Sequence, residues 1–207
     1  MAIKLIAFDL DGVLVEDPGS WASVHKGLGT VLQARKHEEE FYKGLIDYDG
    51  WIRKDALLWN GAEIHIIEDI LNGISLMNGI HETMLKLKEK YKLVIISGGL
   101  KILADCIKEL YNMDYVTANE FLVQDGLIKG MKNSVSFNDK GMLLRNVAMN
   151  FNLNASECAA VGDYLNDLPM FEAAGLSIAF NPKNSQVAKK ANYVVYEKDL
   201  RKLLEIL

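Results

Sequence analysis

Short apolar runs that end in polar or glycine-containing turns recur along the chain and predict the buried strands of a parallel sheet. The runs lie at residues 3–8, 92–96, 158–161 and 177–180. Parallel strands are covered by helices on both faces, so they are apolar almost throughout instead of alternating. Between the runs, apolar residues recur at helical spacing, as they do over residues 102–110 and 143–151. The pattern therefore predicts an α/β fold built on a doubly wound parallel sheet with right-handed crossovers.

The segment 15–78 departs from this rhythm because it contains no strand-like run. Its apolar residues instead form stripes at helical spacing, and glycines separate the stripes. We expect a helical cap inserted after the first strand and lying over the carboxyl edge of the sheet. The predicted organisation is a Rossmann-like core formed by residues 1–14 and 79–207, with a cap at 15–78. A smaller irregularity, an Asp-Gly pair inside the apolar stretch 121–128, predicts a β-hairpin.

Composition narrows the classes of protein that fit this pattern. The chain has 207 residues, of which half are hydrophobic and a quarter charged, which suits a folded core with an insert and excludes a disordered chain. A net charge of −5 argues against a nucleic-acid binder, and the apolar runs are too short to cross a bilayer. The two cysteines, Cys106 and Cys158, form neither a disulfide framework nor a metal motif. We expect a soluble cytoplasmic protein, monomeric or homodimeric, with neither nucleic acid nor membrane as a partner.

Carboxylates follow the predicted strands at the points where those strands end. Asp9 and Asp11 close the first strand, Ser97 closes the second, and Asp163 and Asp167 follow the third. The carboxyl ends of parallel strands meet at one sheet edge, where ligands of such folds bind. Four carboxylates gathered there repel one another unless a cation neutralises them, and Mg²⁺ suits an all-oxygen site that also holds a phosphate.

The spacing of these residues indicates phosphoryl chemistry. Asp9 and Asp11 are two apart on an extended segment and share a face, so one carboxylate can attack while the other handles protons. Ser97 offers a hydroxyl, and the glycines after it let backbone amides approach a phosphoryl oxygen. Lys140, at the start of a predicted helix, would supply a positive charge. Each motif alone is common in solvated turns. Because the motifs follow one another at the ends of the predicted strands, we interpret them together as one site for phosphoryl chemistry.

Four segments together resemble the signature elements of the haloacid dehalogenase superfamily, in the family's order. They are Phe8-Asp9-Leu10-Asp11-Gly12-Val13-Leu14, Ile95-Ile96-Ser97-Gly98-Gly99, Lys140 and Val161-Gly162-Asp163-Tyr164-Leu165-Asn166-Asp167. The Ser-Gly-Gly sequence, the hairpin segment 118–130, Asn166-Asp167 and the helical insert are most similar to the phosphoserine phosphatase group of that superfamily.

The resemblance implies a two-step reaction at the first element. Asp9 would attack phosphorus and form an aspartyl-phosphate, while Asp11 would protonate the leaving alcohol and then activate water. Mg²⁺ would be held by the Asp9 carboxylate, the Asp11 backbone carbonyl and Asp163, with Asp167 supporting the metal shell.

The resemblance also implies how phosphate is held. Ser97, Gly98 and Lys140 would contact the phosphoryl oxygens, and Asn166 would contact substrate or phosphate. Tyr164 stands where the group commonly has glycine, which would narrow the entrance or alter the loop.

The cap departs from what phosphoserine requires. A phosphoserine enzyme of this group pairs the substrate's ammonium and carboxylate with an acidic residue after the first element and an arginine in the cap. An ungapped comparison puts Pro18 and Asp55 at these positions, although Glu16, Asp17 and Arg53 lie nearby. Strict phosphoserine specificity is therefore not expected, and the predicted substrate is a small phosphorylated metabolite.

All three tryptophans, Trp21, Trp51 and Trp59, fall in the predicted cap. They suit either the cap's own small core or an aromatic lining that selects a substrate other than a small amino acid.

The predicted activity is Mg²⁺-dependent phosphomonoester hydrolysis. A phosphotransferase with the same intermediate would use the same residues and stays open. A non-enzymatic phospho-aspartate signalling domain fits less well, because Asp11 and the cap favour turnover over stable phosphorylation. A dehalogenase, which attacks carbon, does not need the second aspartate. The presence of Asp11 therefore argues against that activity.

Overall fold

The computed structural model describes residues 2–207 and contains a seven-stranded sheet in the order β4-β3-β2-β1-β5-β6-β7. All neighbouring strands are parallel except β3 and β4, which are antiparallel. The strands are β1 Leu5–Phe8, β2 Lys92–Leu100, β3 Tyr115–Gln124, β4 Leu127–Lys132, β5 Cys158–Gly162, β6 Leu176–Phe180 and β7 Tyr193–Val195. The predicted doubly wound α/β fold is confirmed.

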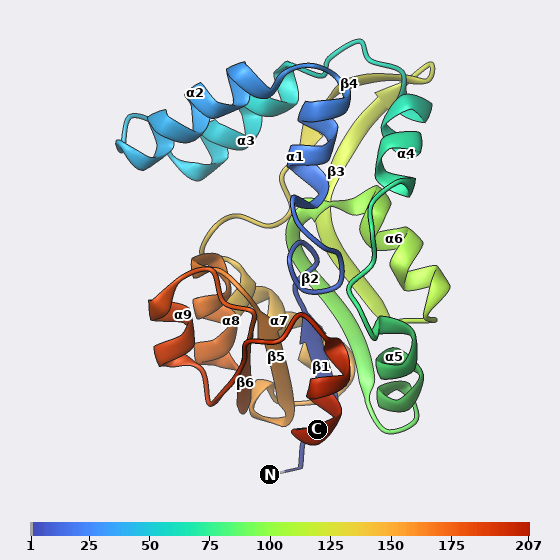
Figure 1. The fold of residues 1–207 in the computed structure, drawn as a ribbon, viewed down its shortest axis with the longest axis vertical. Helices are drawn as coiled ribbons and strands as arrows, with labels where there is room; N and C mark the ends of the chain where they lie inside the picture. The colour runs from blue at the N-terminus through green and yellow to red at the C-terminus, as the bar shows by residue number, and fades with distance from the viewer. Residues whose placement is uncertain (1) are drawn as a thin grey trace.

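Helices cover both faces of this sheet (Figure 1). One face is packed by α5 Ile80–Lys88, α6 Lys101–Leu110 and the 3₁₀ segment η3 Leu200–Glu205. The other is packed by α7 Lys140–Asn150, α8 Leu168–Ala173 and α9 Ser185–Lys190. Short 3₁₀ turns, η1 Ala155–Glu157 and η2 Leu165–Asp167, flank β5.

Strand β1 shows why the apolar run is continuous. Ile6 and Phe8 belong to the hydrophobic cluster on the first face, while Leu5 and Ala7 belong to the cluster on the second. Successive side chains of a strand point to opposite faces, so a strand buried on both sides has no polar position. β1 lies between β2 and β5, where the strand order reverses, and its carboxyl end therefore opens at the switch point of the sheet.

Four helices lie between β1 and α5 in the sequence and form the upper part of the molecule in Figure 1. They are α1 Gly19–Gly27, α2 Val31–Tyr42, α3 Tyr48–Leu57 and α4 Ile64–Asn72. Residues of α1 and α4, such as Val24 and Ile67, join the core cluster that includes Phe8, whereas α2 has no buried residue. The α2–α3 pair accordingly projects beyond the sheet.

Backbone contacts join this helical segment to the core at two places. Its two connections run side by side, because Glu16 N donates to Ser75 O (3.0 Å) and Met77 N donates to Leu14 O (2.9 Å). The β3–β4 hairpin reaches the same segment: Gly61 N donates to Ile128 O (2.8 Å), and Ile128 N donates to Ala62 O (2.9 Å).

The sequence missed some boundaries. The predicted hairpin around Asp125 and Gly126 is confirmed, with both residues at positive φ, but the first half of β3 and all of β7 were not predicted. Ser97-Gly98-Gly99 is not the loop that the pattern indicated. It continues β2 as far as Leu100, with the β2–β3 register broken after Ile96.

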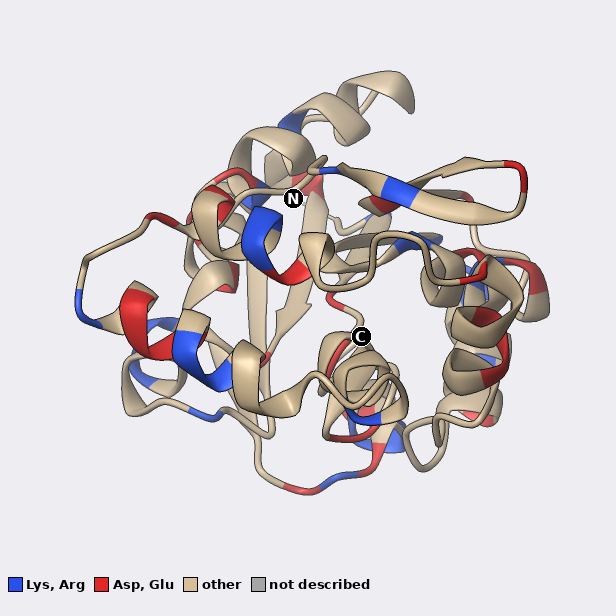
Figure 2. Cartoon of the chain, turned by 90° about the horizontal axis from the view of Figure 1, so that it is seen from above, with Lys and Arg blue, Asp and Glu red and all other residues tan. Residues whose placement is uncertain are grey.

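Acidic and basic residues are interspersed along the ribbon seen from above (Figure 2). Within residues 2–207, none of the helices combines the length and apolar character that crossing a membrane requires.

Candidate active site

Asp9 is the first residue after β1 and lies beside a buried lysine. Lys140, the first residue of α7, has its Nζ 2.6 Å from Asp9 Oδ1 and 2.6 Å from Asp167 Oδ1. The lysine side chain is fully buried, so its charge is balanced by these carboxylates at close range. Burial alone would lower the pKa of Lys140, but Asp167 and Asp9 outweigh it and raise the pKa, which keeps the ammonium charged.

Both carboxylate oxygens of Asp167 accept hydrogen bonds. Its Oδ1 accepts from Lys140, and its Oδ2 accepts from the backbone N–H groups of Asp163 (2.9 Å) and Tyr164 (3.1 Å). This residue therefore fixes both the loop after β5 and the position of Lys140.

Asp163 faces a cation that the sequence analysis did not select. Lys183 Nζ lies 2.8 Å from Asp163 Oδ2 and 2.7 Å from Asp17 Oδ1. Lys183 follows β6 at the same sheet edge, so the strand-end rule that found the aspartates could also have found it. Gly12, at φ +85°, is packed against this pair, and a Cβ there would collide with the Asp163 carboxylate and Lys183 Nζ.

Asp11 is held by the start of α1. Its Oδ1 accepts from Ser20 N and its Oδ2 from Ser20 Oγ, both at 2.7 Å. Desolvation raises the pKa of Asp11 to about 6, against the lowering effect of the Ser20 hydroxyl. A carboxyl group with such a pKa can give up and accept a proton near neutral pH. Ser20 is the second functional residue that the sequence reasoning missed.

Three carboxylates form a group suited to a divalent cation. Oxygens of Asp9, Asp163 and Asp167 lie within 4.8 Å of one another, and all three residues are buried. Burial, followed by repulsion from Asp9 and Asp167, raises the pKa of Asp163 to about 8, and burial with the Asp9 charge raises the pKa of Asp167. A hard cation with oxygen ligands would relieve this repulsion, so the donor set fits Mg²⁺. The Asp11 side chain, bound to Ser20, is outside the group.

The end of β2 forms the opposite wall. Gly98 O accepts from Trp21 Nε1 (3.0 Å) and Asn119 Nδ2 (2.9 Å), while Gly99 N donates to Ser97 Oγ (3.0 Å). These bonds fix the Ser-Gly-Gly backbone next to the carboxylates. A Cβ on Gly99 would come within 2.7 Å of Asp11 Oδ2, so only glycine fits there.

A cavity of about 410 Å³ opens over these groups. Of the residues selected from the sequence, six line it: Asp9, Asp11, Ser97, Gly98, Asp163 and Asn166. Lys140 and Asp167 lie buried directly beneath, in contact with Asp9 or its neighbours. The fold therefore brings all eight together at one sheet edge, under side chains of the helical segment such as Trp21, Tyr48 and Trp51.

Comparison with known proteins decides the family. Residues 3–175 match the model of the haloacid dehalogenase-like hydrolases. The chain belongs to this family. It is 32% identical to a phosphoserine phosphatase of Methanocaldococcus jannaschii over 99% of this chain and 97% of that protein.

Two solved structures superpose on this haloacid dehalogenase-like hydrolase over its whole length. A phospho-aspartyl intermediate analogue of phosphoserine phosphatase superposes with a TM-score of 0.88 at 32% identity, covering 100% of both chains. A substrate-bound phosphoserine phosphatase gives the same TM-score at 31% identity, covering 100% of this chain and 99% of that one. The hydrolase is thus a phosphatase that resembles the phosphoserine phosphatases.

In this hydrolase, the two positions at which the sequence departs from the phosphoserine pattern lie in different surroundings. Pro18 lines the cavity. Asp55 is buried on α3, where Oδ1 lies 2.6 Å from His37 Nδ1 and Oδ2 lies 3.3 Å from His25 Nε2. Arg53 is exposed and lines neither this cavity nor the one beside it in the cap.

Proposed function

We propose that the chain is a Mg²⁺-dependent phosphomonoester hydrolase that acts on a small phosphorylated metabolite through an aspartyl-phosphate on Asp9. The observation that carries the proposal is the arrangement at the end of β1. Asp9 is next to a buried ammonium, while Asp11, two residues on, is held apart from it by Ser20.

In the first step an Asp9 carboxylate oxygen attacks phosphorus and the bond from phosphorus to the ester oxygen breaks. Asp11 gives its proton to the departing alcohol oxygen. Lys140 holds the Asp9 carboxylate in place and lowers the charge at the attacking group, and the Ser97 hydroxyl and the Gly98 amide are positioned to bind phosphoryl oxygens.

In the second step water attacks phosphorus of the aspartyl-phosphate. Asp11, now ionised, accepts the proton from that water, and phosphate leaves as the Asp9 carboxylate is restored. The neighbouring structure of a phospho-aspartyl intermediate analogue supports this order of events.

Mg²⁺ would be held by Asp9, Asp163 and the Asp11 backbone carbonyl, with Asp167 in support, and when bound it would neutralise charge on the phosphoryl oxygens. Asn166, on the cavity wall, would contact substrate or phosphate. In this assignment the core at 1–14 and 79–207 performs the reaction, and the cap at 15–78 selects the alcohol.

The decisive experiment measures phosphate release from a panel of monoesters by the wild-type protein and by Asp9→Asn, with Mg²⁺ or with a chelator. We expect the variant and the chelated enzyme to lose at least about 1,000-fold in kcat/KM. Asp139→Asn, at the residue before Lys140, serves as the matched control and should stay near wild type. Chelator-insensitive turnover would refute the metal assignment, and an active Asp9→Asn protein free of deamidation would refute the nucleophile.

A further inference from the structure

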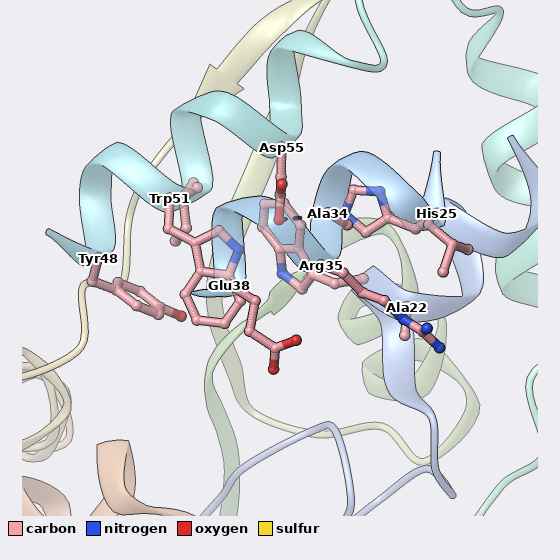
Figure 3. A pocket seen from close by; sticks show the side chains of 11 residues that line it. Ala22, His25, Ala34, Arg35, Glu38, Tyr48, Trp51 and Asp55 are labelled. Carbon is pink, nitrogen blue, oxygen red and sulfur yellow. Dashed lines mark ion pairs between the residues drawn. The ribbon is translucent and has the colours of Figure 1, made fainter. Parts of the chain in front are cut away.

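A second cavity, of about 400 Å³, lies inside the cap and is walled by α1, α2 and α3 (Figure 3). Most of its lining is aromatic or aliphatic: Trp21, Val31, Ala34, Tyr48, Trp51 and Ile52. Neither step of the proposed reaction uses this space.

The cap cavity adjoins the reaction-site cavity. Four side chains line both of them: Trp21, Glu38, Tyr48 and Trp51. In the proposed reaction phosphorus lies at Asp9 and the alcohol leaves beside Asp11, in the cavity that these four side chains also line. The cap cavity is therefore the next space that a larger alcohol reaches.

Charge in the cap cavity does not suit an amino acid. Asp55 and His25, both buried in its wall, are paired with each other, and Asp55 also binds His37. The remaining charged residues, Arg35 and Glu38, are exposed, lie one turn apart on α2 and bring one charge of each sign. Within residues 2–207, His25 Nε2 makes no hydrogen bond, but it faces the Asp55 carboxylate. The charges open to a ligand are therefore the exposed Arg35 and Glu38, which bind a carboxylate or an ammonium group only weakly.

The aromatic wall suits a flat apolar group instead. Trp51 stacks on Phe41 with ring centroids 5.0 Å apart and meets Tyr48 edge-on at 6.0 Å, so both rings are held by neighbours. Rings fixed in this way can pack against a ligand ring with little loss of side-chain entropy.

We propose that the cap cavity binds the alcohol portion of the substrate and that this portion carries an aromatic or bulky apolar group larger than the side chain of serine. The inference rests on the proposed phosphomonoesterase function and adds the substrate class. A cavity of this volume is in the range that small organic ligands occupy. Tyr48 and Trp51 are the specificity-determining residues.

The test compares kcat/KM for three alkyl esters: ethyl phosphate, phosphoserine and 2-phenylethyl phosphate. All have aliphatic leaving alcohols, so differences among them report mainly on binding of the alcohol portion. We expect 2-phenylethyl phosphate to exceed ethyl phosphate by about 10- to 100-fold, the gain from burying one phenyl ring, and to exceed phosphoserine as well.

Ala34→Phe fills the cavity from α2 and should lower the ratio of kcat/KM between the phenyl and ethyl esters towards one. Gln33→Phe places the same ring on the exposed face of the same helix and should keep the preference. Trp51→Leu, which removes a wall, gives a second measurement of the ratio between the phenyl and ethyl esters if Ala34→Phe does not fold.

The outcomes separate the two proposals. Failure to release phosphate from any ester would refute the phosphomonoesterase itself. Turnover in which phosphoserine or ethyl phosphate matches the phenyl ester would overturn the substrate class and leave the reaction standing. An unchanged phenyl-to-ethyl ratio in Ala34→Phe or Trp51→Leu would also overturn it.

Discussion

At the scale of single residues, Ser20 controls the position of the Asp11 carboxylate. Ser20 binds both oxygens of Asp11 and also accepts from Leu100 N (3.2 Å), so it connects α1 to the end of β2 at the reaction site. The Ser20 side chain acts on the proposed reaction only through Asp11, so Ser20 is a positioning residue.

We expect Ser20→Ala to slow hydrolysis of alkyl phosphates by about 10- to 100-fold, because a misplaced Asp11 protonates a poor leaving group inefficiently. The leaving group of an aryl phosphate departs without that proton, so kcat/KM for an aryl phosphate should fall by less than about threefold. Steady-state kcat/KM for both esters checks this, with Ser23→Ala, one turn further along α1, as the control. Equal losses on the two esters would show that Ser20 acts on folding instead.

Residue types and strand ends were enough to predict Asp9, Asp11, Asp163 and Asp167, because carboxylates directly after buried strands have few structural reasons to be there. Ser20 was not predicted, since its importance arises from its contact with Asp11, which only folding creates, and a serine near the start of a helix carries no such signal by itself. Lys183 was not predicted either, although its place after β6 obeys the same strand-end rule.

At the scale of elements, a pair of tyrosines bridges the cap and the core across the cavity mouth. Tyr42 at the end of α2 and Tyr164 in the loop after β5 have their hydroxyl oxygens 2.7 Å apart. The bond is exposed, and both tyrosines line the cavity. Tyr164 thus contributes a contact between the loop after β5 and α2.

Tyr42→Phe removes this bond and should favour a more open cap. One hydrogen bond of about 1 kcal/mol corresponds to roughly a fivefold shift between closed and open forms, so we expect KM to rise by up to that factor while kcat holds or increases. Amide exchange in α2 should quicken as well. Tyr196→Phe, on an exposed tyrosine outside the cavity, provides the comparison. Unchanged KM together with unchanged exchange in α2 would contradict the bridging role.

Elements were predictable where burial on two faces imposes an unbroken apolar run, as in β1 and β5. β7 was not predicted because it is a three-residue edge strand with an exposed tyrosine, Tyr193. The continuation of β2 through Ser97-Gly98-Gly99 was not predicted because glycines weaken a strand pattern. The helical character of residues 15–78 was predicted from stripes at helical spacing, but the bounds of the individual helices were not. The cavity walled by α1, α2 and α3 depends on how these helices pack against one another, which periodicity does not determine.

For the whole molecule, Asp114 links several elements far from the reaction site. It accepts from Lys88 Nζ (2.5 Å) at the end of α5, from Lys92 Nζ (3.0 Å) and from Leu93 N (2.9 Å) at the start of β2. Burial would raise the pKa of Asp114, but these donors outweigh it and hold the pKa below its usual value of 3.8.

A depressed pKa in the folded state stabilises the protein above the unfolded pKa, and this contribution is lost as pH falls through the folded pKa. Asp114→Asn should therefore lower the free energy of unfolding most near neutral pH, and the gap from wild type should shrink below about pH 4. Urea unfolding between about pH 7 and pH 3 measures it. Asp105→Asn, which breaks an exposed pair with Lys101, should change little. A gap that stays constant with pH would show that the Asp114 charge is not the cause.

The paired connections at Leu14–Glu16 and Ser75–Met77 also bear on how such enzymes diversify. Because the chain leaves the core and returns to it through adjacent, hydrogen-bonded segments, the part of the intervening chain beyond α1, which carries Ser20, can be lengthened, trimmed or exchanged in evolution without displacing Asp9 or Asp11. New substrates can then be acquired by remodelling that part, while the residues around Asp9 are inherited unchanged.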